Sequence, residues 1–264
     1  MAVDATAHIH PTALVEPGAE IGPRVRIGPF SVIGPQVVLG EGVEVKSHAV
    51  ITGRTRIGPE TVIFPFATIG EIPQDLKYRG EETELIVGAR NRIREGVTMN
   101  TGTEGGGGIT RVGDDCLFMT GAHVGHDAQV GNRVILANDA ALAGHCILED
   151  DVIVGGLSGI HQWVRIGRGA IIGAVTMVAN DVIPYGLVQG PRGVLDGLNL
   201  VGLKRRGVAR ADISALRAAY RELAEGEGAF QERAQRLAEA DSDYVRELAA
   251  FILGDSDRSF LTPG

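Results

Sequence analysis

Four of the seven histidines fall in one stretch of the chain, at His123, His126, His145 and His161. A carboxylate, Asp127, directly follows the second of them. Two kinds of chemistry use such a set. A neutral imidazole accepts a proton at neutral pH and can serve as a general base, whereas three imidazoles together can hold a zinc ion. Both require the side chains to meet in space, so the elements that carry them are decisive.

A six-residue repeat sets those elements. Apolar residues, mostly aliphatic, recur at every sixth position from Val3 to Ile69, again from Val87 to Met99, and a third time from Val112 to Val178. In the two long blocks the residue two positions earlier is small or β-branched. A period of six is neither helical nor a simple strand alternation. It predicts a short strand with one large and one small inward side chain, followed by a turn.

Three such units close a coil of 18 residues, and coils stack at the strand spacing of about 4.8 Å. The three blocks hold 12, 3 and 12 repeats, a total of 27, which predicts nine coils. An amphipathic helix cannot imitate this pattern over so many repeats. The sequence therefore predicts a mainly β protein built as a parallel β-helix.

Stacking in this fold can be worked out from residue numbers. Within the unbroken block 112–178, residues 18 apart lie directly above one another, which places all four clustered histidines at one edge of the prism, on three adjacent coils. The same arithmetic sets Gly144 over His126 and His145 over Asp127. A glycine above a candidate base leaves room for a substrate and exposes a backbone N–H. We therefore interpret this cluster as functional, in contrast to the isolated and solvated histidines His8, His10 and His48.

Composition and charge exclude several classes of protein. The 264 residues carry 25 Lys and Arg against 33 Asp and Glu, a net charge of −8, which argues against a nucleic-acid partner. No apolar run reaches the roughly 18 residues of a membrane span, and the N-terminus has no signal-peptide pattern. Cys116 and Cys146 are too few for a disulfide framework, occupy the small inward slot of the repeat and suit a reducing compartment. We therefore expect a cytoplasmic protein.

The domain organisation follows from where the repeat is interrupted and where it ends. Two insertions interrupt it, near residues 71–85 and 100–109, and insertions in such solenoids become loops that are often functional. Towards the C-terminus the apolar residues take helical spacing instead, in three stripes within residues 213–252. The sequence thus predicts a β-helix over residues 1–186 and a small α-helical domain over residues 187–264.

Several motifs together resemble one family. They are the repeat itself, the inserted Gln74-Asp75-Leu76-Lys77-Tyr78, the segment His123-Val124-Gly125-His126-Asp127 and the later Leu203-Lys204-Arg205-Arg206-Gly207. In this order they resemble the UDP-N-acetylglucosamine O-acyltransferases over essentially the whole chain. The resemblance implies a left-handed β-helix and a homotrimer with active sites between neighbouring prisms, needing no metal and no cofactor. It also implies the first step of lipid A biosynthesis, in which an (R)-3-hydroxyacyl group passes from acyl carrier protein to the 3-hydroxyl of UDP-N-acetylglucosamine.

The resemblance implies roles for individual residues as well. His126 corresponds to the general base of the family, Asp127 to the carboxylate that orients it, and the backbone of Gly144 to the donor for the tetrahedral oxyanion. A hydroxyl nucleophile needs such a base, whereas a thioester is already activated. The positions that contact substrate in the family are matched by eight further residues, Asp75, Lys77, His123, His145, His161, Gln162, Asn199 and Arg205.

Some positions depart from the family pattern. Asn100 and Thr101 stand where a more basic pair is expected, and Val201 stands where an acidic residue often contacts substrate. Ala174 occupies the position that closes the acyl groove, where glycine admits a long chain and a bulky residue shortens it. The resemblance therefore implies an acyl chain slightly shorter than the glycine enzymes accept.

Other functions stay open at this point. A related N-acyltransferase acting on an amino-sugar would share the fold and the base, although we expect it to carry a large domain before the repeats, which here begin at Val3. A β-helix zinc enzyme of the carbonic anhydrase type would use the histidines as ligands. A purely structural solenoid would tolerate the loss of His126. An amine-bearing acceptor is also possible within the O-acyltransferase family itself.

Overall fold

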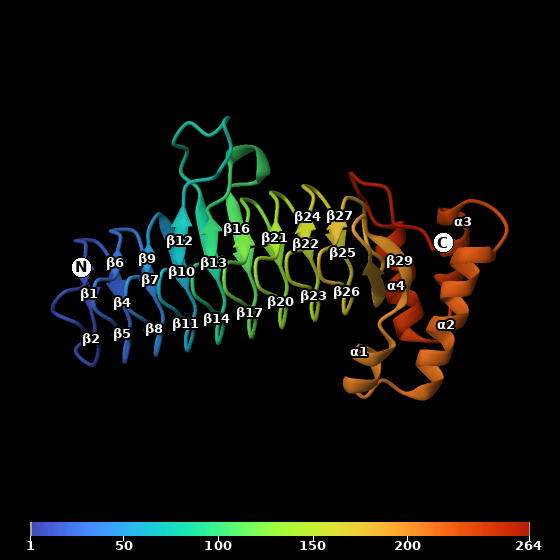
Figure 1. Ribbon diagram of the computed structural model, residues 1–264, viewed down its shortest axis with the longest axis horizontal. Helices are drawn as coiled ribbons and strands as arrows, with labels where there is room; N and C mark the ends of the chain where they lie inside the picture. The colour runs from blue at the N-terminus through green and yellow to red at the C-terminus, as the bar shows by residue number, and fades with distance from the viewer. Residues whose placement is uncertain (1, 264) are drawn as a thin grey trace.

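The computed structural model describes residues 2–263, which form a long three-sided prism with helices at one end (Figure 1). Each six-residue unit contributes one short strand, and each strand pairs in parallel with the strand one coil further on. Successive units lie on successive faces, so three sheets run the length of the prism. The architecture is the parallel β-helix that the repeat predicts.

The three sheets share strands β1–β27 in strict rotation, and the second sheet also takes β28 and β29. The first sheet holds β1 (Ala2–Val3), β4 (Glu20–Ile21), β7 (Val38–Leu39), β10 (Arg54–Ile57), β13 (Glu84–Val87), β16 (Ile109–Val112), β19 (Gln129–Val130), β22 (Ile147–Leu148) and β25 (Arg165–Ile166). The second holds β2 (His8–Ile9), β5 (Arg26–Ile27), β8 (Glu44–Val45), β11 (Val62–Ile63), β14 (Arg92–Ile93), β17 (Leu117–Phe118), β20 (Ile135–Leu136), β23 (Ile153–Val154), β26 (Ile171–Ile172), β28 (Gly186–Gln189) and β29 (Val194–Leu198). The third holds β3 (Leu14–Val15), β6 (Val32–Ile33), β9 (Val50–Ile51), β12 (Thr68–Glu71), β15 (Thr98–Asn100), β18 (His123–Val124), β21 (Ala141–Leu142), β24 (Gly159–Ile160) and β27 (Met177–Val178).

Register follows the 18-residue arithmetic wherever the repeat is unbroken. Ala141 pairs with His123, and Gly159 pairs with Ala141 one coil further on. The insertions lengthen two coils, so that Ile69 pairs with Met99. Strands β1–β27 fill nine coils, which confirms the number that the sequence predicts.

The interior is filled by the two inward side chains of each repeat. In the unit of β20, for example, Val134 and Leu136 are both fully buried. Burying one such aliphatic side chain stabilises a fold by about 1.5–3 kcal/mol, so the stacked core holds the prism together. Cys116 and Cys146 take small inward positions, and burial raises the pKa of their thiols to about 11 and about 12 respectively. Neither thiol is therefore a nucleophile at neutral pH.

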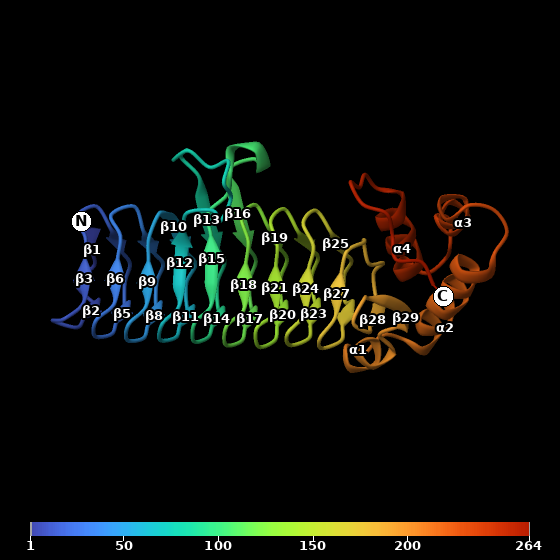
Figure 2. The same cartoon turned by 45° about the horizontal axis from the view of Figure 1, so that its top comes forward.

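Both insertions rise from the same edge of the prism (Figures 1 and 2). The first insertion loop (residues 72–83) links β12 to β13, and the second (residues 101–108) links β15 to β16 and contains one 3-10 turn, η1 (Glu104–Gly106). The two are tied together, because Thr83 Oγ1 donates to Thr101 Oγ1 at 3.0 Å and the Glu84 N–H donates to the Gly108 carbonyl at 2.8 Å. They form one raised wall beside the prism.

The strands do not end with the last full coil. Strand β28 pairs in parallel with β26, and β29 pairs antiparallel with β28, so the second sheet continues as far as Leu198. A division of the chain into two domains at residue 186 stays a prediction, and these two strands carry the sheet past that point.

Four helices follow the sheets, α1 (Leu200–Arg205), α2 (Arg210–Glu225), α3 (Phe230–Leu237) and α4 (Asp243–Leu253). The three apolar stripes of the sequence become the buried faces of the last three, with Leu216, Ala234 and Leu248 among their buried residues. The small helical part is therefore confirmed. Within residues 2–263, no helix combines the length and the apolarity that crossing a bilayer requires.

Candidate active site

The clustered histidines lie along one corner of the prism, where the third sheet turns into the first. Asp127, His145 and Trp163 occupy the same turn position in successive coils, with left-handed φ values of 61°, 61° and 66°. Backbone hydrogen bonds hold this stack, from the His145 N–H to the His126 carbonyl at 2.9 Å and from the Trp163 N–H to the Gly144 carbonyl at 3.3 Å. The 18-residue stacking predicted from the sequence is therefore confirmed at this corner.

His126 and Asp127 form a buried hydrogen-bonded pair. His126 Nδ1 lies 2.8 Å from Asp127 Oδ2, and the two side chains are 8% and 1% exposed. An ionised carboxylate only accepts hydrogen bonds, so Nδ1 carries the proton of the neutral ring. The lone pair then sits on Nε2, which is the form of the ring that can take a proton from a substrate.

The second insertion loop holds the carboxylate of this pair. Thr103 donates to Asp127 twice, from its backbone N–H at 2.8 Å and from its Oγ1 at 2.6 Å. The Asp127 N–H in turn donates to Thr110 Oγ1 at 2.7 Å. Gly106 packs so closely that a Cβ at its position would overlap the Asp127 carboxylate. Asp127 is therefore fixed by a loop as well as by its neighbour on the prism.

Gly144 covers the His126 ring from the next coil. A Cβ built on Gly144 would collide with the imidazole, so only glycine fits at this position. Within residues 2–263 no acceptor takes the Gly144 N–H. The ring therefore lies against a backbone donor that is free to bind a developing negative charge.

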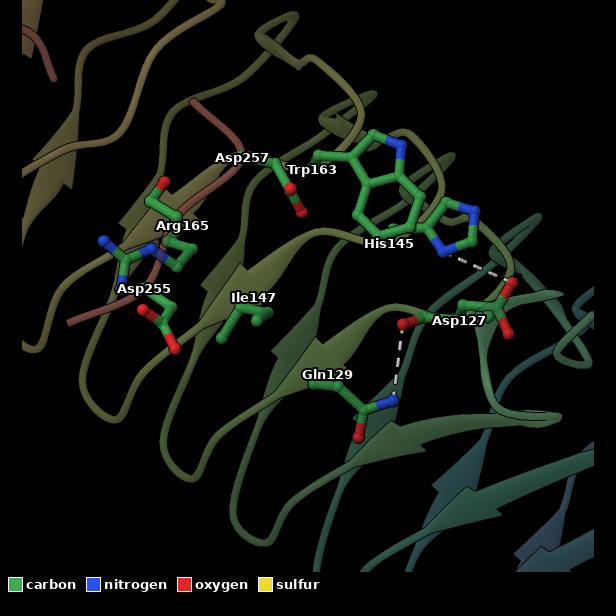
Figure 3. Close-up of a pocket in the computed structure, with 10 residues that line it drawn as sticks. Asp127, Gln129, His145, Ile147, Trp163, Arg165, Asp255 and Asp257 are labelled. Atoms are coloured by element: carbon green, nitrogen blue, oxygen red, sulfur yellow. Dashed lines mark hydrogen bonds and ion pairs between the residues drawn. The ribbon is translucent and has the colours of Figure 1, made fainter. Parts of the chain in front are cut away.

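His145 connects the buried pair to an aromatic stack. Its ring lies 3.8 Å from that of Trp163 at an interplanar angle of 4°, and it meets the His126 ring edge to face at 4.9 Å. Its Nδ1 is 3.6 Å from Asp127 Oδ2 (Figure 3). Burial lowers the pKa of His145 below its ordinary value of 6.5 despite the opposing charge of Asp127, and burial also lowers the pKa of His123. These environments favour neutral rings.

Two cavities open beside this stack. The larger, about 470 Å³, has His145 and Trp163 on one side and the C-terminal residues 255–257 on another (Figure 3). The smaller, about 320 Å³, lies between the insertion loops and the same two rings, and its lining includes Asp75 and Lys77. Residues far apart in the chain thus surround one corner, with room on both sides of the stack for an extended substrate.

Similarity to known proteins decides the family. A family model described as Udp N-acetylglucosamine O-acyltransferase, domain 2, matches residues 181–261, and one described as bacterial transferase hexapeptide (six repeats) matches residues 18–53. The acyl-(acyl-carrier-protein)–UDP-N-acetylglucosamine O-acyltransferase of Paracoccus denitrificans is 71% identical over 195 residues, which is 74% of each chain. Its namesake from Agrobacterium fabrum is 46% identical over 99% of this chain and 97% of its own. The chain belongs to the UDP-N-acetylglucosamine O-acyltransferase family.

Solved structures of UDP-N-acetylglucosamine acyltransferases have the same fold. The protein from Campylobacter jejuni matches with a TM-score of 0.92 at 36% identity, covering 97% of this chain and 100% of that one. The protein from Arabidopsis matches with a TM-score of 0.84 at 32% identity, covering 96% and 100%. The prism is thus the left-handed parallel β-helix of the O-acyltransferase family, as the sequence predicts.

Other residues expected at an O-acyltransferase site lie along the same corner. His123 is in β18, and its Nδ1 is 2.7 Å from Thr98 Oγ1. His161 and Gln162 lie one coil above Gly144, where Arg258 from the C-terminal end of the chain contacts both. The corner therefore gathers residues from the prism, from an insertion and from the end of the chain.

Two of the expected substrate contacts of the family lie elsewhere. Asn199 caps α1, because its side chain accepts from the Gly202 N–H at 2.9 Å and donates to the Gly169 carbonyl at 2.9 Å. Arg205 is exposed in the last turn of α1. Figure 1 places α1 across the prism from the insertion loops. Within one chain these two residues are therefore not part of the histidine corner.

Ala174, the position expected to limit acyl length, is exposed in the turn between β26 and β27. Its neighbour Val175 and the equivalent Leu157 one coil below are 61% and 66% exposed. This turn is at the opposite edge of the third sheet from the histidine corner. Two apolar side chains are thus exposed near Ala174, and its role in acyl length stays a prediction.

Metal binding is the main chemical alternative to proton transfer at the histidine corner. In the part of the chain that the structure describes, His126, Asp127 and His145 are the one group of ligand atoms that could share an ion, all within 4.8 Å of one another. The Asp127 oxygens, however, already accept from Thr103 and from His126 Nδ1. A zinc ion would have to displace these bonds, so the arrangement fits proton transfer better than metal binding.

Sequence reasoning missed two residues that contact the histidine corner, Thr103 and Arg258. Thr103 lies in an insertion and Arg258 near the end of the chain, and neither has a place in the 18-residue register. The one available signal was the position of the second insertion, which directly precedes the coil that carries His126.

Proposed function

We propose that this chain transfers an (R)-3-hydroxyacyl group from acyl carrier protein to the 3-hydroxyl of UDP-N-acetylglucosamine, the first step of lipid A biosynthesis. The names of its relatives from Paracoccus denitrificans and Agrobacterium fabrum contain both substrates. The observation that carries the proposal is the buried His126–Asp127 pair, whose ring has its lone pair on Nε2 and lies against the backbone of Gly144.

In the proposed reaction, His126 Nε2 takes the proton of the sugar 3-hydroxyl while that oxygen attacks the thioester carbonyl. A C–O bond forms and the carbonyl oxygen becomes an oxyanion, which the Gly144 N–H would stabilise. Collapse of this intermediate breaks the C–S bond, and the carrier's thiolate takes the proton from His126. A general base typically contributes about 10²–10⁴ in rate, and one oxyanion donor about 3–4 kcal/mol. Asp127 keeps the ring in the form that can start the cycle.

The remaining substrate contacts belong to the same proposal. Asp75, Lys77 and His145 share the smaller cavity, and His123, His161 and Gln162 would extend the binding surface along the corner. Asn199 and Arg205 would have to act from another chain, which is one reason to propose a homotrimer. A second is the set of exposed apolar side chains on the prism, which include Leu14, Phe30, Phe66 and Leu157.

The length of the acyl chain is proposed to be slightly shorter than in family members with glycine at the position of Ala174. One methyl group in an apolar groove changes discrimination by about 1–3 kcal/mol. Profiling the purified protein against acyl carriers of graded length tests this, and a clear preference for the longest chain would contradict it.

The reaction itself is tested by a transfer assay with 3-hydroxyacyl carriers and with UDP-sugars that bear either a hydroxyl or an amine at the 3-position. An ester-linked product from the hydroxyl acceptor is expected. Transfer to the amine alone would favour the amino-sugar alternative, and no transfer to either acceptor would overturn the proposal.

A zinc enzyme is the second candidate, because three ligand atoms lie within 4.8 Å of one another at the same corner. Elemental analysis separates the two, since stoichiometric zinc in the active protein would favour the metal. A cytoplasmic location is proposed as well, and the free thiols of Cys116 and Cys146 support it.

A further inference from the structure

The C-terminal tail, residues 254–263, is fixed to the last coils of the prism. The Asp181 N–H donates to the Ser259 carbonyl at 2.8 Å. The Asp181 side chain, fully buried, accepts from Ser256 Oγ at 2.6 Å and from Arg165 Nε at 2.7 Å. The end of the chain thus has a defined position beside the histidine corner, and it forms one side of the larger cavity (Figure 3).

One residue of this tail, Arg258, contacts two adjacent residues of the corner with a single guanidinium. Its Nη2 lies 2.7 Å from His161 Nδ1, although the two residues are 97 positions apart in the chain. Its Nε donates to the Gln162 carbonyl at 3.1 Å. Arg258 is half-buried, whereas His161 is exposed.

The guanidinium of Arg258 decides which nitrogen of His161 carries the proton. A guanidinium has five N–H donors and no acceptor, so His161 Nδ1 accepts and is unprotonated. The proton of the neutral ring is then on Nε2. His126 is the reverse case, because Asp127 accepts from its Nδ1 and leaves the lone pair on Nε2. Two histidines of one corner are therefore held in opposite forms by partners of opposite charge.

We propose that Arg258 is a positioning residue that holds His161 in the Nε2–H form, so that His161 donates a hydrogen bond to a substrate oxygen and does not serve as a second base. The inference rests on the proposed function, which makes His161 a substrate contact. The oxygen is a phosphate or carbonyl oxygen, since both accept such a bond.

The contacts around Nδ1 support this assignment. The Gln162 carbonyl is 3.3 Å from His161 Nδ1, but an unprotonated nitrogen cannot donate to it. Arg258 supplies a donor to each of these acceptors, and the fixed planar fork of the guanidinium sets the angle of the ring between them. A lysine has no such fork: its ammonium carries three freely rotating N–H donors on a flexible stem and would not fix the angle of the ring.

Kinetics of Arg258→Gln provide the first test. The KM of one substrate should rise about ten-fold, as expected for the loss of one well-placed hydrogen bond, while kcat stays nearly unchanged. A rise for the sugar nucleotide places the oxygen on that substrate, and a rise for the acyl carrier places it on the donor. Arg258→Lys should restore part of the loss.

The matched control is Arg236→Gln, an arginine of α3 whose partner is Glu222, and it should leave both KM values unchanged. The inference is overturned if Arg258→Gln changes neither KM, or if its effect is a loss of thermal stability that Arg236→Gln reproduces.

A second test does not depend on catalysis. In protein carrying 15N-labelled histidine and no substrate, the Nδ1 resonance of His161 should have the shift of an unprotonated acceptor, with His161→Gln used for assignment. In Arg258→Gln it should move towards the average of the two neutral forms. A protonated Nδ1 in the unaltered protein overturns the inference even if the enzyme is active. If the Nδ1 result holds in a protein with no transferase activity, only the proposed function fails.

Discussion

Two histidines of this chain sit in equivalent turns of different coils. His48 and His145 both have left-handed backbone, with φ of 59° and 61°. Both rings lie against aromatic neighbours, His48 tilted to its neighbours by 37° and 31° and His145 stacked at 4°. His48 lies between Phe30 and Phe66 with ring centroids 5.1 and 5.3 Å away, and His145 lies 3.8 Å from Trp163. The repeat therefore builds the same local structure twice, at two corners of the prism.

The two corners differ in what surrounds the ring. His48 is exposed, and its ring neighbours are apolar. His145 is half-buried, 3.6 Å from the carboxylate of Asp127 and edge to face with His126. Only this second corner has an insertion folded over it, through Thr103. A histidine in this fold thus becomes chemically useful through the loop and the carboxylate beside it, while the repeat supplies its place.

Replacing His126 should produce the largest difference between the corners. His126→Ala removes the proposed base and should lower kcat by about 10²–10⁴, with the circular dichroism spectrum unchanged because the core of the prism is untouched. His48→Ala removes a ring from the other corner and should leave kcat as it was. Steady-state transfer assays measure both. Similar small effects from the two variants would mean that the corners do not differ in function.

The contribution of the loop can be isolated with Thr103→Val, which keeps the shape of the side chain and removes the hydrogen bond from Oγ1 to Asp127. A hydrogen bond to a charged group is worth about 1.5–3 kcal/mol, so kcat should fall by roughly ten- to a hundred-fold with little change in KM. Thr103→Ser keeps the hydroxyl and should recover most of the rate. A Thr103→Val protein with the original kcat would show that the insertion does not act through Asp127.

Substitutions in the glycine run of the same loop should have a smaller effect on kcat. Two adjacent glycines, Gly106 and Gly105, supply the test and its control. A side chain at Gly106 would overlap the Asp127 carboxylate, whereas a Cβ at Gly105 would meet nothing within 4 Å. Gly106→Ala should therefore lower kcat by about ten-fold, since small displacements of a catalytic group are costly, and Gly105→Ala should not. Equal losses in the two variants would point to stiffness of the loop and away from contact with Asp127.

The repeat made most of the fold and part of the site predictable. Every coil between Val112 and Val178 has the same length, so residue numbers alone set Gly144 over His126. The 18-residue stacking rule could not place Thr103 and Arg258, because an insertion and a tail have no fixed register with the coils. Asn199 marks another limit, since a polar residue that resemblance assigns to substrate uses its side chain to cap a helix in the fold.

The smallest expected difference between the two corners is in the stability of the protein in acid. Burial lowers the pKa of His145 below 6.5, so the unfolded chain binds more protons than the native one as the pH falls through this range. The stabilising contribution of the neutral ring to the free energy of unfolding is fully present above pH 6.5. It is lost as the pH falls through the lowered pKa of the native protein. His145→Gln removes that titration and should flatten the decline of Tm between about pH 7 and about pH 5. Part of the decline should remain, because burial also lowers the pKa of His123.

The matched variant for this measurement is His48→Gln, which removes an exposed ring from the equivalent turn and should leave the slope of Tm against pH as it was. Thermal unfolding in a series of buffers at one ionic strength measures both slopes. If His145→Gln and His48→Gln gave the same slope as the unaltered chain, burial of the His145 ring would have no energetic consequence. The two corners would then differ in the groups that surround the ring but not in what the ring itself contributes to stability in acid.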